Sequence, residues 1–524
     1  MPFGVDDAVL AAIVVSDYIY HRWFADSPPV QPPDKVVIPT AQAGSIVPLL
    51  WGRYRVNKPL LAWPGSPATV ACTDAPFIDP NITSGYYYLL DQLFNVCIGF
   101  DGGVHRLKSM WSGDVEMGRN GDPSSEGLAV LPGDGTGGDP FPFAGAIFVS
   151  NDADDTTGDP TGAEHQLGYV EFLNGADDQT LVSPDRYAGA AMVAQGVDPA
   201  LIPGYRGYQS VFLFSRSDAP LDRWVFGTSS SLPTYSFEMA SYAAPSKSFG
   251  HQISDFFGGG IDANPIDVIY DILTGGFGKL QTDPARTDTA SFTAAASVLY
   301  AEGIGYSNCY EEGTTAADII NDILRQIDAV LYENPYDGKI YVKLIRADYE
   351  PGLVRELRQD LGCSRIETFA AGGWTGLPNK VTVSFVDRSM GYVTNTAPGM
   401  GDANAARLQD TEVSEQLVSF AGCCTMTMAK ILCARETAAL CRPIAKFTAI
   451  CDQRWRDVNP GDVLACTWPK LGLSRAFFRV AGTTRAKQTS DGSVSIQLIQ
   501  EFFQVYRGVV SPYGPLPPLG HSPG

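Results

Sequence analysis

The side chains that could carry out chemistry are scattered along the chain without a catalytic spacing. There is no zinc-protease motif, no nucleophile elbow, no Walker loop and no GxGxxG after a strand, so we predict no catalytic residue and no cofactor. Glu164 and His165 are an adjacent acid and base, but a surface position explains them better than a catalytic role. Carboxylate pairs arise by chance in so acidic a chain and do not indicate a glycosidase. The histidines are far apart: His21, His105, His165, His251 and His521.

Two glycine- and aspartate-rich runs have part of the pattern of a ligand loop. Residues 133–138, GDGTGG, are glycine-rich enough for a phosphate loop, but no Lys followed by Ser or Thr comes after them, so we favour a surface loop. Residues 151–159 carry oxygen-bearing side chains at alternating positions, as a calcium loop does. Gly158 comes one position late for an EF-hand and no glutamate follows at the required spacing. A solvated loop is therefore favoured, calcium is the alternative, and we assign no metal ligand.

The ten cysteines are too sparse for a disulfide framework. Several lie in apolar runs, where a free thiol packs as a small hydrophobic side chain. Cys424, Cys433 and Cys441 are strung along one predicted helix. Core packing is favoured there over a metal or cluster site, because zinc ligands are usually paired and closely spaced. We expect a protein made in a reducing cytoplasm.

The length and net charge of the chain limit the number of domains and the kinds of partner that it can have. A chain of 524 residues predicts roughly two to four domains. Its net charge of −21 argues against a surface that grips nucleic acid, which needs clustered Lys and Arg. The apolar run at residues 8–15 is too short to span a membrane and has no basic leader or cleavage site. We predict a short amphipathic helix there, docked on its own or a neighbouring subunit, and no stable membrane insertion.

The strongest structural signals lie between residues 264 and 346. Asn264, Pro265 and Gly275 have the residue types expected at the N-cap, the first turn and the end of a helix. Thr315 and Asp318 resemble a capping box at the start of a second helix. Two apolar runs flank a turn at residues 334–338 and predict a hairpin. We therefore predict a helix, helix, hairpin module that holds no reactive constellation.

Strand patterns surround that module, and together they predict a multidomain, β-rich α+β fold. Residues 86–100 are apolar enough for a buried strand or a short helix, and residues 425–440 predict a helix. The other strands are expected at residues 44–56, 60–63, 146–150, 169–173, 210–215, 232–238, 379–387, 444–451, 463–467, 477–482 and 494–503. The domains expected are 1–40, an N-terminal helix and Pro-rich link; 41–111 with 205–255, a first β domain; 112–204, an inserted peripheral domain; 256–375, the helix-hairpin module; 376–510, a C-terminal barrel-like β domain with one helix; and 511–524, a Pro/Gly-rich tail.

Four residues are candidates for contacts between domains or subunits, because Trp and Arg are favoured at the centres of interfaces. Trp51, Arg53 and Arg55 lie in the first strand block, and Arg206 lies in a Tyr-Arg-Gly block. The alternative is that Trp51 belongs to a core and that the arginines lie on solvated strand faces.

Several ordered segments resemble the phage tail tip proteins. The segments are GSIVPLLWGRYRV followed by LLAW, YYYLLDQLFNVCIGFDGGVHRLKSMWSG, YRGYQSVFLF with LPTYSFE, NPIDVIYDILTG, residues 315–346, and PNKVTVSFVD. They are similar, in the same order over most of residues 40–505, to the baseplate hub or host-specificity proteins of lambda-like, long-tailed phages and to the related protein of gene transfer agents.

The resemblance implies a non-enzymatic trimeric hub at the distal tip of a virion tail. Its barrel-like domains would continue the tail tube, with distal tail protein packed outside and the tape measure protein ending inside. The hub would organise fibre or spike proteins for host attachment and close the channel until DNA ejection. DNA would pass through the lumen without specific binding.

Two departures from the relatives shape this expectation. Lambda-like relatives continue into receptor-binding modules, so we expect residues 511–524 to lead to a separate fibre or spike protein. Gene transfer agent relatives carry a glycosidase-like barrel that no segment here is long enough to hold. Residues 112–204 occupy the place of a variable peripheral domain, for which carbohydrate binding is one expectation, but these residues do not identify a ligand. The alternatives are a tip enzyme that degrades cell wall or surface polysaccharide, and another virion scaffold such as a connector.

Overall fold

The computed structural model describes the chain in ranges separated by gaps. The predicted N-terminal helix, the runs at residues 133–138 and 151–159, the strand at 146–150 and the tail at 511–524 lie outside the described residues. Described are residues 46–73, 83–113, 115–119, 169–182, 186–214, 225–227, 231–249, 253–254, 261–276, 278–311, 313–374, 376–402, 413–485 and 492–501.

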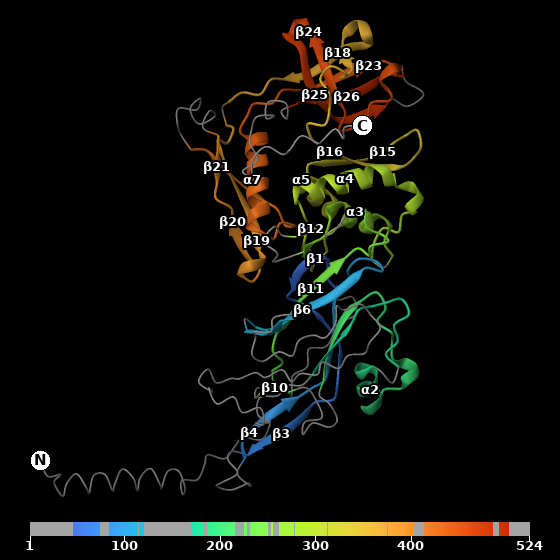
Figure 1. Ribbon diagram of the computed structural model, residues 1–524, viewed down its shortest axis with the longest axis vertical. Coiled ribbons are helices and arrows are strands. Elements are labelled where there is room, and N and C mark those ends of the chain that lie inside the picture. The colour runs from blue at the N-terminus through green and yellow to red at the C-terminus, as the bar shows by residue number, and fades with distance from the viewer. Residues whose placement is uncertain are drawn as a thin grey trace, which may run out of the picture.

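Two antiparallel sheets form a β-sandwich at one end of the elongated molecule (Figure 1). The first sheet has the order β14-β1-β11-β6-β7 and the second the order β2-β5-β9-β8. Successive side chains of a strand point to opposite faces, and on the facing sides of the two sheets Leu50, Phe94, Val211 and Phe237 fill the space between them. The strands are β1 (Leu49–Val56), β2 (Leu60–Pro64), β5 (Gln92–Cys97), β6 (Val104–Ser112), β7 (Val115–Arg119), β8 (Tyr169–Leu173), β9 (Gln209–Phe214), β11 (Tyr235–Tyr242) and β14 (Asn308–Tyr310).

Smaller elements extend the sandwich. For residues 86–100 the sequence allowed either a buried strand or a short helix, and the structure has parts of two strands there, β4 and β5. The described part of segment 112–204 includes β8, which pairs with β9 and so belongs to the second sheet. Helix α2 covers that sheet through Ala188 and Met192. These elements are β3 (Ala68–Thr73), β4 (Thr83–Leu89), β10 (Val225–Gly227), α2 (Tyr187–Ala194) and η1 (Pro199–Leu201).

A central module of three helices and a hairpin follows. Both predicted N-caps are confirmed: Asn264 accepts from the backbone N–H of Ile266, and Thr315 from that of Asp318. Both predicted helices are present, but a third helix, α4, lies between them and was not predicted. The elements are β12 (Ile253–Ser254), β13 (Ile261–Asp262), α3 (Pro265–Thr274), η2 (Pro284–Arg286), α4 (Thr289–Glu302), α5 (Ala316–Ile327), β15 (Ala329–Glu333) and β16 (Ile340–Leu344).

A four-stranded sheet and one long helix form a compact unit beside the central module (Figure 1). Helix α7 packs along β19, and Thr425 caps it by accepting from the N–H of Met428. We call this part the β19 unit. Its elements are β19 (Lys380–Asp387), η4 (Arg388–Met390), β20 (Val393–Thr396), β21 (Met400–Gly401), β22 (Glu415–Ser419) and α7 (Met426–Leu440).

The C-terminal sheet has the order β17-β24-β25-β26-β23-β18 and curves into an open half-barrel at the other end of the molecule (Figure 1). The α+β class is therefore confirmed, while a barrel-like shape is seen in this one part of the described chain. The half-barrel has its own apolar core, which includes Trp455 and Phe478. Its elements are β17 (Glu356–Leu357), η3 (Gln359–Leu361), β18 (Cys363–Ala370), β23 (Lys446–Cys451), η5 (Gln453–Trp455), β24 (Val463–Trp468), η6 (Pro469–Leu471), β25 (Leu473–Arg485) and β26 (Val494–Gln500).

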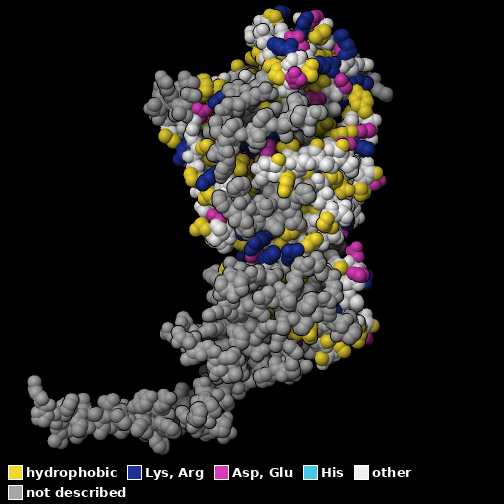
Figure 2. Space-filling view, viewed as in Figure 1, with side chains coloured by type: hydrophobic (Ala, Val, Ile, Leu, Met, Phe, Trp, Pro, Cys, Tyr) yellow, Lys and Arg dark blue, Asp and Glu magenta, His cyan; other side chains and the backbone are white. Residues whose placement is uncertain are grey.

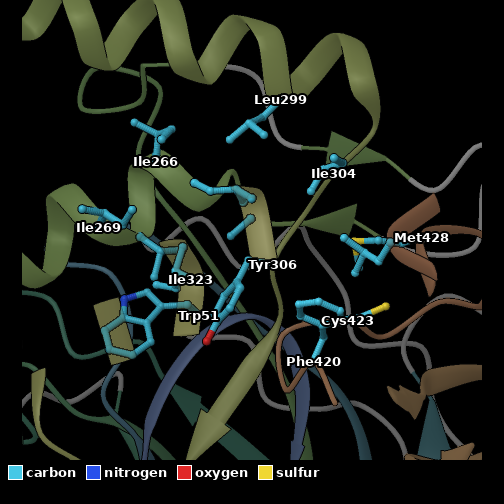
Figure 3. Packing of buried hydrophobic residues seen from close by; sticks show 14 of the residues in the cluster. Trp51, Ile266, Ile269, Leu299, Ile304, Tyr306, Ile323, Phe420, Cys423 and Met428 are labelled. Atoms are coloured by element: carbon cyan, nitrogen blue, oxygen red, sulfur yellow. The ribbon is translucent and has the colours of Figure 1, made fainter. Parts of the chain in front are cut away.

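One continuous apolar core joins the sandwich, the central module and the β19 unit. Figure 3 shows Trp51 of β1 close to Ile323 of α5, with Leu299 of α4 above and Met428 of α7 to the side. Full burial of each such side chain contributes about 1.5–3 kcal/mol to stability. These three parts therefore stabilise one another, whereas the half-barrel is cored separately. None of the described helices is long and apolar enough to cross a membrane.

Candidate functional site

The candidate site is the contact where the outer face of the first sheet meets the central module and the turn after β19. Gly52 has φ +75°, and a Cβ added there would lie 2.5 Å from the carbonyl oxygen of Tyr306, so glycine allows the two segments to approach closely. The backbone N–H of Arg53 then donates to Ser307 Oγ at 3.0 Å. We call this contact the junction; its polar residues are Trp51, Arg53, Glu238, Asp262, Asp271, Lys279, Ser307, Arg388 and Tyr392.

A buried ion pair lies at the centre of the junction. Asp262 of β13 accepts hydrogen bonds from Arg388 Nη2 and, at 2.5 Å, from Ser307 Oγ. The side chains of Arg388 and Asp262 are 8% and 6% exposed. Arg388 Nη2 also donates to the carbonyl oxygen of Arg53 at 3.4 Å, so one guanidinium contacts all three parts of the shared core. Burial alone would lower the pKa of Arg388, but the charge of Asp262 raises it well above its ordinary value.

Glu238 of β11 collects three donors from two parts of the chain. It accepts from Arg53 Nε at 2.7 Å, from the Tyr392 hydroxyl at 2.6 Å and from Ser109 Oγ at 3.1 Å. Burial raises the pKa of Glu238, but the hydrogen bond and charge of Arg53, with the two hydroxyls, outweigh burial and hold the pKa below its ordinary value. Glu238 is therefore an anion that ties the β19 unit to the sandwich.

A second buried ion pair lies within the central module and is hydrogen-bonded to the sandwich. Lys279 Nζ lies 2.6 Å from Asp271 Oδ2, and the two side chains are 2% and 7% exposed. Asp271 also accepts from Trp51 Nε1 at 2.7 Å and from the N–H of Asp101 at 2.9 Å, while Lys279 donates to the carbonyl oxygen of Gly99 at 2.7 Å. Because Asp271 lies in the last turn of α3, where the helix dipole disfavours an acid, Lys279 supplies the compensating charge.

His105 lies buried on β6 close to this second ion pair. Its Nδ1 is 3.0 Å from Ser241 Oγ. Burial, followed by the positive charge of Lys279, lowers the pKa of His105 to about 4. The imidazole is therefore neutral at pH 7, and acid would introduce a second positive charge beside Lys279.

A row of basic side chains lies on the same outer face of the first sheet. Arg53 on β1 and Arg106 and Lys108 on β6 lie close enough to repel one another electrostatically. Burial, then repulsion by Arg53 and Arg106, lowers the pKa of Lys108. Figure 2 shows Lys and Arg side chains gathered at the level where β1, β11 and β6 lie in Figure 1. This is a local concentration of positive charge on a chain whose net charge is −21.

The structure places two of the four predicted contact residues at the junction. Trp51 is fully buried and bonded to Asp271, and Arg53 is bonded to Glu238. Arg55 stays within the sandwich, where it donates to Ser236 Oγ at 2.8 Å and stacks over Trp111. Arg206 also bonds locally, from its Nε to the carbonyl oxygen of Gln179 at 3.0 Å. A role for any of them between subunits stays a prediction.

Sequence reasoning missed the acidic and C-terminal partners in the junction. Arg388 meets Asp262 across 126 residues of sequence, and Trp51 meets Asp271 across 220. No local pattern marks either pairing. Within the described ranges, no group of His, Cys, Asp or Glu side chains could hold a metal ion. The arrangement fastens parts of the chain together through buried charges that pair with one another, although Arg388 Nε has no hydrogen-bond partner among the described residues.

Comparison with known proteins agrees with this architecture. Residues 315–483 match the sequence model of a family described as putative phage tail protein. The match begins at the cap of α5 and ends in β25, so it covers the end of the central module, the β19 unit and most of the half-barrel. No curated protein sequence matches the chain.

Solved structures extend the likeness to the whole chain. A chain from the virion of a native gene transfer agent particle is 14% identical, with 96% of this chain and 98% of that chain covered and a TM-score of 0.51. A tail protein from Neisseria meningitidis MC58 is 9% identical over 51% of this chain and 76% of that one, with a TM-score of 0.31. The prophage MuSo2 tail protein from Shewanella oneidensis is 12% identical over 63% and 89%, with a TM-score of 0.28. The first of these shows a shared fold from end to end.

Proposed function

We propose that this protein is a structural component of a phage-like tail and forms the hub at the distal tip. The observation that carries the proposal is the likeness of fold to a gene transfer agent virion chain over nearly the full length of both chains. The phage tail family match over residues 315–483 supports it independently from sequence. The hub would organise distal tail, tape measure and fibre or spike proteins, and it would close the channel until DNA leaves. It acts without catalysing a reaction.

The junction is consistent with a rigid structural component. Three parts of the chain share one apolar core, and the buried pair Arg388–Asp262, 8% and 6% exposed, joins the β19 unit to the central module. Separating these parts would expose the shared apolar core to water, which is unfavourable.

The β19 unit offers a surface for contacts between copies in a trimeric ring. Its helix α7 covers one face of the sheet, and apolar side chains are exposed on its other elements. Leu417 of β22 is 64% exposed and Val393 of β20 is 59% exposed. If these side chains form one contiguous patch in the assembled ring, they would act as an interaction surface. The exposed members are Met390, Val393, Met400, Val413 and Leu417.

The mass of the assembled protein tests this proposal. We expect native mass spectrometry to give three times the chain mass of 56.3 kDa at micromolar concentration. Leu417→Lys should shift the population towards single chains, whereas Leu353→Lys, at a position 81% exposed in another part of the chain, should leave it unchanged. Six or twelve copies would instead indicate a connector-like ring.

The position in the particle and the absence of catalysis need separate measurements. Labelled antibody against the protein should bind one end of isolated tails in electron micrographs, at the end distal to the capsid. Purified protein should release no soluble fragments from cell walls or surface polysaccharide. Reproducible release of such fragments would replace the structural hub with the tip-enzyme alternative.

A further inference from the structure

Two cysteines face each other at the edge of the half-barrel. Cys363 is the first residue of β18 and Cys451 is the last residue of β23, and the two are Cα partners in the antiparallel ladder. Both side chains are buried in the half-barrel core, where Cys363 Sγ lies 3.8 Å from the carbonyl oxygen of Arg365. Directly opposed residues of antiparallel strands have Cα atoms about 4.5–5.5 Å apart, which lies inside the range that a disulfide spans.

The register singles out this pair. Cys466 shares the same core, but it lies on β24 and its ladder partners are Ala476 and Leu357. Cys97 and Cys309 face Gln209 and Leu50. Among the described cysteines, Cys363 and Cys451 are the two that face each other across a ladder.

The local backbone allows the pair to be reached. Strand β18 is an edge strand of the half-barrel, and its ladder with β23 shifts register between Cys363 and Arg365. Gly362, directly before it, has φ +98°. Edge strands with irregular pairing open locally at lower free energy than central strands. Interaction between the neighbouring thiols lowers the pKa of Cys363 and raises that of Cys451, so Cys363 is the better attacking group.

We propose that Cys363 and Cys451 are a redox modification site that forms a disulfide when the protein meets an oxidising small-molecule disulfide. The Cys363 thiolate attacks one sulfur of that molecule, and one small thiolate leaves. Cys451 then loses its proton and attacks Cys363 Sγ, and the second small thiolate leaves. Two protein thiols are oxidised to one disulfide, the small disulfide is reduced to two thiols, and the two protons end on the leaving groups.

The bond would close a loop around the β19 unit. The chain leaves the half-barrel after β18, builds the β19 unit and returns at β23, so the loop closed between Cys363 and Cys451 contains β18, the β19 unit and β23. A cytoplasm rich in reduced thiols keeps the pair open during synthesis, and an oxidising exterior closes it. The crosslink would fasten the half-barrel edge after the protein has folded.

Peptide mapping on the full-length wild-type chain tests the proposal. The purified, reduced protein is incubated with oxidised glutathione, denatured with N-ethylmaleimide and digested with trypsin without reductant. Trypsin places Cys363 in peptide 359–365 and Cys451 in peptide 447–454, each with a single cysteine. We expect these two peptides to be recovered as one linked species, and the thermal transition of the half-barrel to rise by about 5–10 °C.

Two variants test whether the disulfide forms between Cys363 and Cys451 or involves the nearby Cys466. Cys466→Ser should keep the linked species, and Cys363→Ser should abolish both the link and the rise in the thermal transition. Recovery of both wild-type peptides as separate maleimide adducts would overturn the proposal. A link from Cys363 to Cys466 would overturn it as well.

Discussion

The central module meets the sandwich on one side and the half-barrel on the other, and the two contacts differ in what they bury. Towards the sandwich, apolar side chains form one core with it, and the module's own pair Lys279–Asp271, 2% and 7% exposed, hydrogen-bonds to Gly99 and Trp51 of the sandwich. Towards the half-barrel, each side keeps its own core, and the pair Lys343–Asp462 is 33% and 35% exposed. One buried cation, Arg479, reaches across by donating to the carbonyl oxygen of Arg346 at 2.8 Å.

The difference separates two ways of joining domains. A shared apolar core couples the folding of the two sides, because neither can lose its structure without exposing the other. A contact through half-exposed ion pairs fixes the relative position of two domains but adds little to their stability, since solvent screens such pairs. We therefore expect the sandwich, central module and β19 unit to unfold together and the half-barrel to unfold in a separate calorimetric transition.

The largest expected effect comes from leaving one buried charge at the sandwich contact unpaired. Lys279→Met removes the cation and leaves Asp271 buried without its counter-ion, which should destabilise the shared-core transition by about 3–5 kcal/mol. Urea unfolding followed by fluorescence measures it. The matched control is Lys247→Met. The side chain of Lys247 is 53% exposed and that of its partner Asp101 is 46% exposed, so this variant should lose about 1 kcal/mol of stability or less. Equal effects would show that burial does not distinguish the two pairs.

The next effect tests the close approach at Gly52. Gly52→Ala places a Cβ 2.5 Å from the carbonyl oxygen of Tyr306 at a left-handed φ, so it should cost about 2–5 kcal/mol from strain and overpacking. Gly113→Ala has φ +58° and open space around the new Cβ, so it should show only the backbone penalty of about 1–2 kcal/mol. A similar loss in both variants would contradict a tight contact at Gly52.

Two buried groups of the shared-core parts respond to acid in opposite directions. Burial, followed by the charge of Lys279, lowers the pKa of His105 from 6.5 to about 4, so its contribution to stability is complete above pH 6.5 and is lost as pH falls towards 4, by roughly 3 kcal/mol. Burial raises the pKa of Asp267 from 3.8 to about 6, and because the folded protein then takes up a proton as pH falls, stability gains a similar amount over the same range. His105→Gln should remove only the loss, so between pH 7 and pH 4 the first calorimetric transition of this variant should gain stability relative to the wild type. An unchanged pH profile would count against His105.

The smallest effect is expected at the half-barrel contact. Asp462→Asn removes the partner of Lys343 but leaves both groups partly solvated, so either transition should shift by about 0.2–1 kcal/mol. Scanning calorimetry with the wild type as reference measures it. A loss as large as that of Lys279→Met would mean that the two contacts are equivalent.

Sequence reasoning succeeded where the signal was local. The caps at Asn264 and Thr315 and the hairpin of β15 and β16 were predicted, because each depends on residues a few positions apart. Helix α4 was missed because alanines at positions such as Ala295 and Ala296 form much of its buried face and leave a weak apolar stripe. Such a stripe is hard to see against a Ser- and Thr-rich background.

The candidate site was less predictable than the fold. Trp51 and Arg53 were singled out because their types are favoured at contacts, and both lie at the junction. Asp262, Lys279 and Arg388 were not singled out. A charged residue can be buried when a partner of opposite charge lies beside it, and the three-dimensional fold determines which residues become partners. The order of the strands in the sequence also did not predict the sheet to which each strand belongs. Strands β1 and β2 are neighbours in sequence but lie in different sheets.

The order of strands in the first sheet has a consequence for how the chain is made. Strand β1 lies between β11 and β14, and the N–H of Arg53 finds Ser307 only 254 residues later. At a synthesis rate of about 5–20 residues per second, β1 waits on the order of 10–50 s at the ribosome before its second neighbour exists. The sandwich therefore cannot close from its N-terminal end as it emerges. Its unpaired strand edges must be shielded meanwhile, which makes chaperone supply a determinant of yield for this protein.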